Sequence, residues 1–277
     1  MSNRNSHANK QAARERLRAE RERQAKKEKT ARQLKVAGAV VVVLAIAGGI
    51  GFAVSNSSSG SKNTKVSDKD WRAAAEKTAF SKPANTTGEK GDTILIGDAK
   101  AKETIEIYED PRCPACAIFE RNGGKTLNEG IEQGRYKVRF VMANFIDDMA
   151  GGSGSKNAVS ALGAALNVSP DAFMEYKEVL YSEKNHPEER DDAFSDDERL
   201  IEIAQQVKEL KGNKEFEKAV KEGTYDKWGL EMSKLFEKNK IGSTPTLMYK
   251  GEKLTYDGQS TPMSQEQMTA ALDKVLK

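Results

Sequence analysis

Short apolar or alternating stretches in the middle of the chain predict β-strands, and a longer segment with helical spacing lies between two of them. The strand candidates are residues 92–97, 103–110 and 135–146, the last being rich in Val and Phe. Residues 113–133 predict a helix that breaks or kinks at its paired glycines, Gly123-Gly124. We expect the first two strands to form a hairpin and the third to return after the helix, which makes a mixed sheet with a crossover helix.

Helical spacing then dominates until two strands return near the C-terminus. Apolar residues at i, i+3 and i+4 predict helices at 155–167, 170–182, 196–211, 215–221 and 225–240. Residues 244–251 and 253–258 predict a final hairpin. Residues 264–277 predict a last helix, in which Ser264 and Gln267 have the spacing of a capping box.

An apolar run near the N-terminus, residues 36–54, contains no charged residue. As a helix it would be about 28 Å long, close to the roughly 30 Å hydrocarbon core of a bilayer. It is longer than the apolar core of most signal peptides, and a long arm precedes it, so we expect an uncleaved signal anchor. Cleavage within the following AVSNSS remains the alternative.

Charge is distributed unevenly around this run. Residues 1–35 contain twelve Lys or Arg and four Glu, a balance of +8, whereas the whole chain carries +3 and the remainder therefore −5. By the positive-inside rule, a basic arm before an apolar span places the N-terminus in the cytoplasm and the body outside. We interpret the arm as a topology determinant, with contact to anionic lipid as a second role, and expect no nucleic-acid partner.

Both cysteines of the chain, Cys113 and Cys116, lie in the stretch DPRCPACAIFE. Such a pair is a redox couple, half of a zinc site or a small structural bridge. A bridge over so short a loop stabilises little. The other strong candidates for zinc ligands are His7, expected across the membrane, and His186, expected as a surface residue in a charged loop at 183–195. We therefore favour the redox couple and expect no metal.

The expected position of Cys113, between a strand and a helix, favours its thiolate. Pro114 suits the first helical turn, so Cys113 would cap the helix and face free N–H groups at the positive end of the helix dipole. Arg112 is expected to add positive charge. Cys116, one turn later, is expected to be more buried and to resolve mixed disulfides formed on Cys113.

Two distant stretches together carry a family resemblance. YEDPRCPACAIFE with the later GSTPTLMYKG resembles the thioredoxin superfamily, and the long helical region between them resembles its DsbA-like branch, in the membrane-tethered form of actinobacteria and other Gram-positive bacteria. The resemblance covers about 85–277. It implies an α/β thioredoxin fold, a mixed central sheet with flanking helices, into which a helical subdomain is inserted at about 155–240. It also implies that Pro245 is cis beside the active-site disulfide and that Thr244 offers backbone groups to an extended substrate.

The motif departs from its relatives at two points. Many DsbA-like sequences have a buried Glu six residues before the first Cys, but here Ile107 occupies that position, between Glu106 and Glu109. The resemblance therefore supplies no proton relay there. The active-site dipeptide Pro114-Ala115 also lacks the His often found in strong oxidants, so the thiolate is expected to depend mostly on the helix dipole and backbone N–H groups.

The predicted organisation has four parts: a basic cytoplasmic arm at 1–35, a single transmembrane signal anchor at 36–54, a linker with a short helix at 55–84, and the DsbA-like domain at 85–277. We expect a membrane-anchored, extracytoplasmic oxidoreductase that donates disulfides to secreted proteins with cysteines, with the Cys113–Cys116 disulfide in place of a cofactor. The resemblance implies reoxidation by a membrane quinone-linked enzyme of DsbB or vitamin K epoxide reductase type. The alternatives are a disulfide reductase or isomerase of the same fold and a tethered peptide-binding module that is not an enzyme.

Overall fold

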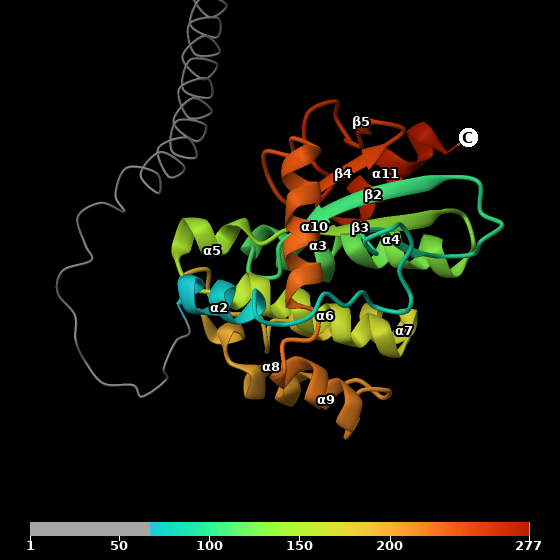
Figure 1. Ribbon diagram of the computed structural model, residues 1–277. Coiled ribbons are helices and arrows are strands. Elements are labelled where there is room, and N and C mark those ends of the chain that lie inside the picture. Colours follow the sequence, from blue (N-terminus) through green and yellow to red (C-terminus); the bar gives the residue numbers. More distant parts are fainter. Residues whose placement is uncertain (1–66, 277) are drawn as a thin grey trace, which may run out of the picture. The chain divides into compact units, whose positions relative to one another are not determined.

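A mixed five-stranded sheet lies at the centre of the computed structural model, which describes residues 67–276 (Figure 1). Its strand order is β1-β3-β2-β4-β5. The strands are β1 (Ile94–Ile96), β2 (Thr104–Glu109), β3 (Lys137–Met142), β4 (Thr246–Tyr249) and β5 (Glu252–Lys253). The sheet is mixed, as predicted, because β2 runs parallel to β3 and antiparallel to β4.

The first strand, β1, pairs antiparallel with β3 and not with β2. The predicted hairpin between residues 92–97 and 103–110 is therefore wrong. Both edges of β2 are occupied by other strands, since the crossover through the following helices brings β3 to one edge and β4 pairs with the other. The remaining position for β1 is the outer edge of β3. As a result, β2, which leads to Cys113, is the central strand of the sheet.

Helices surround this sheet, and several of them gather at the end of the molecule away from β5 (Figure 1). The helices are α2 (Asp68–Ala75), α3 (Pro114–Arg121), α4 (Gly123–Glu132), α5 (Phe145–Ala150), α6 (Gly154–Val168), α7 (Pro170–Leu180), α8 (Asp197–Ala204), α9 (Lys214–Lys221), α10 (Asp226–Lys238) and α11 (Gln265–Val275), with a 3-10 turn at Ala193–Ser195. Helices α6 to α10 occupy the predicted insertion between β3 and β4.

Two local predictions about helix ends are confirmed. The helix after Cys113 breaks at Asn122, directly before the paired glycines, which start α4. The Ser264 hydroxyl accepts a hydrogen bond from the backbone N–H of Gln267 and so caps α11. The Gln267 side chain in turn accepts from the N–H of Met263, one residue before the cap. Side chains of this kind replace the partners that the first turn of a helix lacks.

Three predicted elements are shorter than expected. The strand predicted at 135–146 ends at Met142, and its last two residues begin α5. The helix predicted at 196–211 ends at Ala204, and the second strand of the final hairpin, predicted at 253–258, is only the two-residue β5. In each case buried apolar residues continue past the element, such as Ala143, Val207 and Leu254, and the pattern alone does not distinguish them from continued secondary structure.

The core joins the sheet to the inserted helices. Phe140 of β3 meets Phe173 of α7 edge to face, with ring centroids 5.5 Å apart. Helix α6 is buried along most of its length, and its Gly163 allows α10 to approach closely, since a Cβ there would lie 2.7 Å from the Trp228 ring. The sheet and the insertion therefore share one apolar core, which gives the loops between them fixed positions.

The stretch before β1 is packed on the inserted helices. Trp71 of α2 is buried and its indole N–H donates to Asn157 at 3.4 Å. Farther on, the Asn85 amide donates to the Leu166 carbonyl at 2.8 Å, and the Trp228 indole donates to the Gly91 carbonyl at 2.7 Å. The short helix predicted within the linker at 55–84 is thus Asp68–Ala75, and it contacts the body.

The predicted basic arm at 1–35, the predicted span at 36–54 and the first part of the predicted linker lie outside the described residues. Within residues 67–276, no helix is both long and apolar enough to cross a membrane. The signal anchor and the domain boundaries stay predictions.

Candidate active site

The two cysteines lie at the junction of the central strand β2 and helix α3. Cys113 is the N-cap of α3 and Pro114 is its first residue, as predicted. The peptide bond between Thr244 and Pro245 is cis, also as predicted. The Cys113 thiol lies 3.6 Å from the Thr244 carbonyl oxygen, so the structure brings together two segments that are 131 residues apart in the sequence.

The surroundings of Cys113 lower the pKa of its thiol to about 6. The largest cause is a hydrogen bond from the Cys116 thiol; burial opposes it, and Thr244 and then the backbone N–H groups of Cys116 and Ala115 add to it. The helix N-terminus therefore contributes as expected, although the thiol makes no formal capping hydrogen bond. The main contribution, from the second cysteine, was not anticipated from the sequence.

Cys116 is in the opposite situation. It is fully buried, and burial raises the pKa of its thiol well above the usual range, with further increases from its hydrogen bond to Cys113 and from the charges of Cys113 and Glu109. The two sulfurs therefore differ strongly in acidity. At neutral pH the structure favours a thiolate on Cys113 and a protonated thiol on Cys116.

A buried group of charged side chains lies beside Cys116. The Lys177 ammonium of α7 is 3.2 Å from a Glu109 oxygen and 2.5 Å from a Glu120 oxygen. These three residues are called the Lys177 cluster below. Burial, and then the charge of Glu120, raise the pKa of Glu109 well above its usual range. Burial lowers the pKa of Lys177, but the two carboxylates outweigh that effect and raise it overall.

Glu109 was not among the residues expected in the site. Side chains along a strand alternate between its faces, so Ile105, Ile107 and Glu109 share one face of β2, and all three are fully buried. Glu109 thus lies two residues after the position that holds the buried Glu in many DsbA-like sequences, on the same face. Counting alternate positions from Ile107 was the signal in the sequence that could have identified it.

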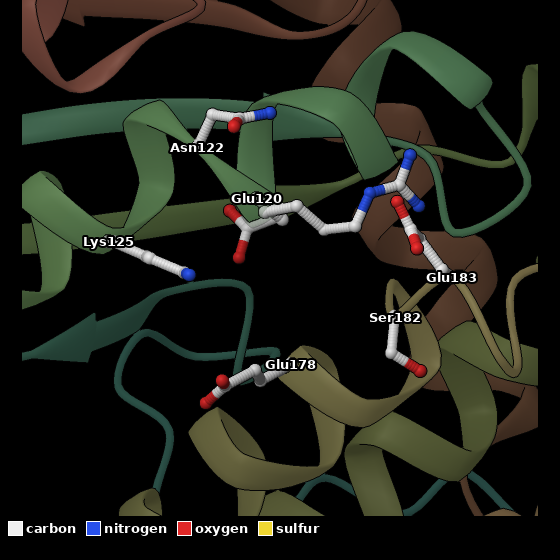
Figure 2. Close-up of a pocket in the computed structure, with 7 residues that line it drawn as sticks. Glu120, Asn122, Lys125, Glu178, Ser182 and Glu183 are labelled. Carbon is white, nitrogen blue, oxygen red and sulfur yellow. The ribbon is translucent and has the colours of Figure 1, made fainter.

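A surface pocket adjoins the Lys177 cluster. It has a volume of about 430 Å³ and lies between the end of α3, the start of α4 and the end of α7. Figure 2 labels Glu120, Asn122, Lys125, Glu178, Ser182 and Glu183 among the side chains that line it. Glu120 is the member of the Lys177 cluster that lines this pocket. The pocket therefore connects the buried cluster to solvent.

Arg112 does not have the predicted role beside the Cys113 thiolate. Its guanidinium is fully buried and donates to Asp147 at 2.7 Å and to the carbonyls of Gly151 and Glu189 at 2.9 Å each. It also lies 3.0 Å from Asp192. The guanidinium is committed to these partners and is not among the causes that lower the pKa of Cys113.

These partners extend into a larger buried ion cluster. The Lys156 ammonium of α6 lies 3.2 Å from the second oxygen of Asp147. The residues called the Arg112 cluster below are Arg112, Asp147, Asp192 and Lys156. The cluster joins the loop before Cys113 to α5, to α6 and to the loop before α8.

Asp110 positions the same loop and was also missed from the sequence. Its carboxylate accepts hydrogen bonds from the Arg112 and Ile146 N–H groups and from the Ser155 hydroxyl, and its carbonyl accepts from the Cys113 N–H at 2.9 Å. Burial outweighs these bonds and raises the pKa of Asp110 to about 7. Its role is to hold the turn that places Cys113 at the end of β2.

His186 is not the exposed surface residue that was predicted. Its ring stacks on Tyr181 with centroids 5.8 Å apart and meets Phe194 edge to face at 6.3 Å. Burial, with the nearby charge of Arg121, lowers the pKa of His186 to about 4, so it is neutral at physiological pH. Tyr181 in turn belongs to the buried apolar group that contains both cysteines.

Known proteins resemble this chain in sequence and in fold. Residues 89–274 match a family model described as Thioredoxin. The reduced form of the disulfide bond oxidoreductase DsbG from Mycobacterium tuberculosis is 26% identical, with a TM-score of 0.53, over 62% of this chain and 83% of that protein. BdbD from Bacillus subtilis in its oxidised form is 21% identical, with a TM-score of 0.55, over 71% of this chain and 99% of that one, and supports the fold.

A curated relative matches a shorter part. The serine/threonine-protein kinase PknE of Mycobacterium tuberculosis is 28% identical over 121 residues, which is 42% of this chain. The chain spans only about a fifth (21%) of the length of that relative.

Proposed function

The chain belongs to the thioredoxin family as a DsbA-like protein thiol–disulfide oxidoreductase, and from that premise we propose that it donates disulfides to secreted proteins outside the cytoplasmic membrane. The observation that supports this direction of transfer is the difference in pKa between the two thiols. The pKa of Cys113, lowered to about 6, reflects a stabilised thiolate, and this thiolate exists only in the reduced form. Whatever stabilises the reduced form makes the disulfide a better oxidant.

In the proposed reaction, a substrate thiolate attacks the Cys113 sulfur of the oxidised pair. The bond between Cys113 and Cys116 breaks, Cys116 leaves with the electron pair, and a mixed disulfide forms on Cys113. A second substrate thiolate then attacks the substrate sulfur of that mixed disulfide and expels the Cys113 thiolate. The substrate is oxidised by two electrons and the cysteine pair is reduced. In the reverse direction, the Cys116 thiolate attacks Cys113 and releases the substrate.

Cys116 needs a proton once it has left, and Glu109 is the proposed donor. Burial raises the pKa of Glu109 well above its usual range, which favours the protonated carboxyl, and Glu109 lies close enough to Cys116 to act on its thiol. Glu120 shares the Lys177 ammonium with Glu109 and lines the pocket of Figure 2, which offers exchange with water. Glu109 would therefore replace the relay that Ile107 removes from the usual position.

Substrate would be held beside Cys113 by the segment Thr244-Pro245. The proximity of the Thr244 carbonyl to the Cys113 sulfur supports a role in binding an extended chain. Pro114 is exposed and Ala115 is half-buried, so the dipeptide between the cysteines would face the substrate.

The predicted basic arm and apolar span support an extracytoplasmic domain anchored in the cell membrane, with the N-terminus in the cytoplasm. A membrane quinone-linked enzyme of DsbB or vitamin K epoxide reductase type is the proposed reoxidant.

Two measurements on the full chain test the proposal. Equilibration with glutathione buffers should give a reduction potential nearer that of DsbA, about −120 mV, than that of thioredoxin, about −270 mV. The oxidised protein should also restore activity to a reduced, unfolded substrate protein, and Cys113→Ala should not. A potential at or below that of thioredoxin would make the protein a reductase, and a turnover that Cys113→Ala retains would exclude the assigned role of that cysteine.

The order of the two cysteines has its own test. Cys116→Ala should accumulate mixed disulfides through Cys113, because the thiol that releases them is gone, and Cys113→Ala should trap far fewer. Equal trapping by both variants, measured on non-reducing gels, would show that the roles are misassigned.

A further inference from the structure

The buried position of Cys116 creates a difficulty for the reaction. In both directions of the proposed exchange Cys116 carries a negative charge, as the leaving group or as the attacking thiolate. It is fully buried, and burial raises the pKa of its thiol well above the usual range, so a charge on this sulfur is disfavoured. A buried anion without a hydrogen-bond donor is costly. A donor that faces Cys116 would lower the barrier in either direction.

Tyr181 has the properties required of such a donor. It is 1% exposed and packs in the same buried apolar group as Cys113, Cys116 and Ala117. Its hydroxyl has no hydrogen-bond partner among residues 67–276. Buried hydroxyls are nearly always partnered, so the Tyr181 hydroxyl is an unused donor on a residue that packs in the same buried group as the reactive cysteines.

The ring of Tyr181 is held on several sides. His186 stacks on it at 5.8 Å, the Lys177 ammonium lies 5.6 Å from its centroid, and Arg121 donates to its backbone carbonyl at 3.1 Å. Burial, and then the charges of Glu109 and Cys116, raise the pKa of Tyr181 well above its usual range. The phenol therefore keeps its proton at physiological pH and remains a donor.

We propose that the Tyr181 hydroxyl donates a hydrogen bond to the Cys116 sulfur when that sulfur is a thiolate. The inference rests on the proposed function, because it concerns the same thiol exchange. When the substrate thiolate attacks Cys113, the electron pair of the broken bond goes to Cys116, and the Tyr181 hydroxyl stabilises the new charge without giving up its proton. Glu109 then supplies the proton to Cys116.

The test is Tyr181→Phe, which keeps the ring and its stacking on His186 and removes only the hydroxyl. Tyr176→Phe is the matched control, since Tyr176 is a fully buried tyrosine of the same region whose hydroxyl already donates to the Leu200 carbonyl at 3.0 Å. Rapid mixing of the oxidised full chain with a thiol peptide should show attack on Cys113 slowed about tenfold in Tyr181→Phe, the effect of one hydrogen bond to a charged group. Tyr176→Phe should react at the wild-type rate.

A second readout does not depend on the proposed function. In the Cys113→Ala background, the pH dependence of Cys116 alkylation reports the acidity of that thiol alone. Adding Tyr181→Phe should lower the thiolate fraction at a given pH by about tenfold. If the wild type fails to oxidise substrates but this shift appears, the proposed function is wrong and the donor stands. An unchanged alkylation profile, or an equal effect of Tyr176→Phe, would overturn the assignment of Tyr181.

Discussion

Two buried ion clusters flank the cysteine motif, and their charges are satisfied to different degrees. In the Arg112 cluster, cations and carboxylates lie 2.7–3.2 Å apart, and backbone carbonyls accept from the guanidinium, whose Nε alone has no partner among the described residues. The Lys156 ammonium there also pairs with the partly exposed Asp68 and Asp148. In the Lys177 cluster, one ammonium serves two carboxylates, and one Glu109 oxygen has no hydrogen-bond partner among the described residues. The clusters differ most in Glu109, because burial and the charge of Glu120 raise the pKa of that carboxyl and favour its protonated form.

This difference separates a structural ion cluster from a reactive one. Both clusters are buried, and each contains one residue just before Cys113 in the sequence, Arg112 in one and Glu109 in the other. Burial and proximity in sequence therefore do not distinguish the two clusters. A carboxyl whose pKa is raised beside a thiol can exchange a proton with that thiol, which sets Glu109 apart from the carboxylates of the Arg112 cluster. Four substitutions or titrations test this contrast.

The largest expected effect is the loss of the Arg112 cation. Arg112→Met leaves Asp147 and Asp192 buried beside a single remaining ammonium, and removing one partner of a buried pair typically costs about 3–5 kcal/mol of unfolding free energy. Denaturant titration of the full chain measures this loss. The pKa of Cys113 in the folded variant should stay at about 6, because Arg112 does not act on that thiol.

The matched control for that variant is Arg199→Met, whose partner Glu202 is exposed at the surface. An exposed pair contributes at most about 1 kcal/mol. Equal losses for both variants, or a shift in the Cys113 thiolate titration caused by Arg112→Met, would contradict a structural role for the Arg112 cluster.

Removal of the Lys177 ammonium should lower the free energy of unfolding less at low pH than at neutral pH. In Lys177→Met the two carboxyls can take up protons, so we expect a loss on the order of 1–3 kcal/mol near neutral pH. A carboxyl whose folded pKa is raised contributes stability that is present at low pH and is lost as pH rises through that pKa. The loss should therefore grow from acid to alkaline pH in denaturant titrations, and a loss that is constant with pH would contradict the proton uptake.

The acidity of Cys113 should appear in the stability of the reduced protein. Its thiol titrates at about 6 when folded, against about 8.5 when unfolded. A lowered pKa contributes stability that is full above the unfolded value and is lost as pH falls through the folded value. Unfolding free energies of reduced wild type and Cys113→Ala should thus diverge by about 1–3 kcal/mol as pH rises from about 6 to about 8.5.

Cys116 supplies the contrast within the same experiment. The pKa of its thiol is raised, so its contribution is present at low pH and is lost as pH rises above the unfolded value. Reduced wild type and Cys116→Ala should therefore not diverge in the same direction. Parallel curves for both cysteine variants would contradict the assigned difference in acidity.

The smallest expected effect on unfolding free energy comes from neutralising Glu109 without changing its shape. Glu109→Gln should slow disulfide donation by about tenfold to a hundredfold, because Cys116 loses its proton donor. Its unfolding free energy at low pH should change by less than about 1 kcal/mol, since the native carboxyl is protonated there too. Glu178→Gln, on the wall of the pocket in Figure 2, is the control and should keep the wild-type rate. A Glu109→Gln enzyme with the wild-type pH profile would remove Glu109 from the proton path.

Local features of the site followed from the sequence because they depend on neighbouring residues. Pro114 after Cys113 was enough to place the helix start, since proline at that position needs no N–H partner. The paired glycines marked the break before α4, and Ser264 marked the cap of α11. The cis bond before Pro245 came from the family resemblance and is present. The signal anchor and the roles of the cysteines remain predictions.

Features that depend on distant partners did not follow. Arg112 was assigned to the thiolate because it precedes Cys113, yet its guanidinium finds Asp147, Asp192 and two carbonyls contributed by later loops. His186 was assigned to the surface because its neighbours are charged, yet it stacks on Tyr181. Such side chains contact residues that are distant in the sequence and that only folding brings close. Their sequence neighbours therefore do not reveal these partners.

The sequence by itself determined that a cysteine pair follows a strand and opens a helix, because hydrophobic periodicity and proline stereochemistry act over a few residues. The distant Thr-Pro segment beside the pair was implied by the family resemblance and not by this local pattern. Only the tertiary structure decided that β1 pairs with β3 and that Glu109, Lys177 and Tyr181 surround Cys116. Those contacts join β2 to α7 across 68 residues of chain. Burial then sets the acidity of each group, since the cost of a charge depends on the protein packed around it.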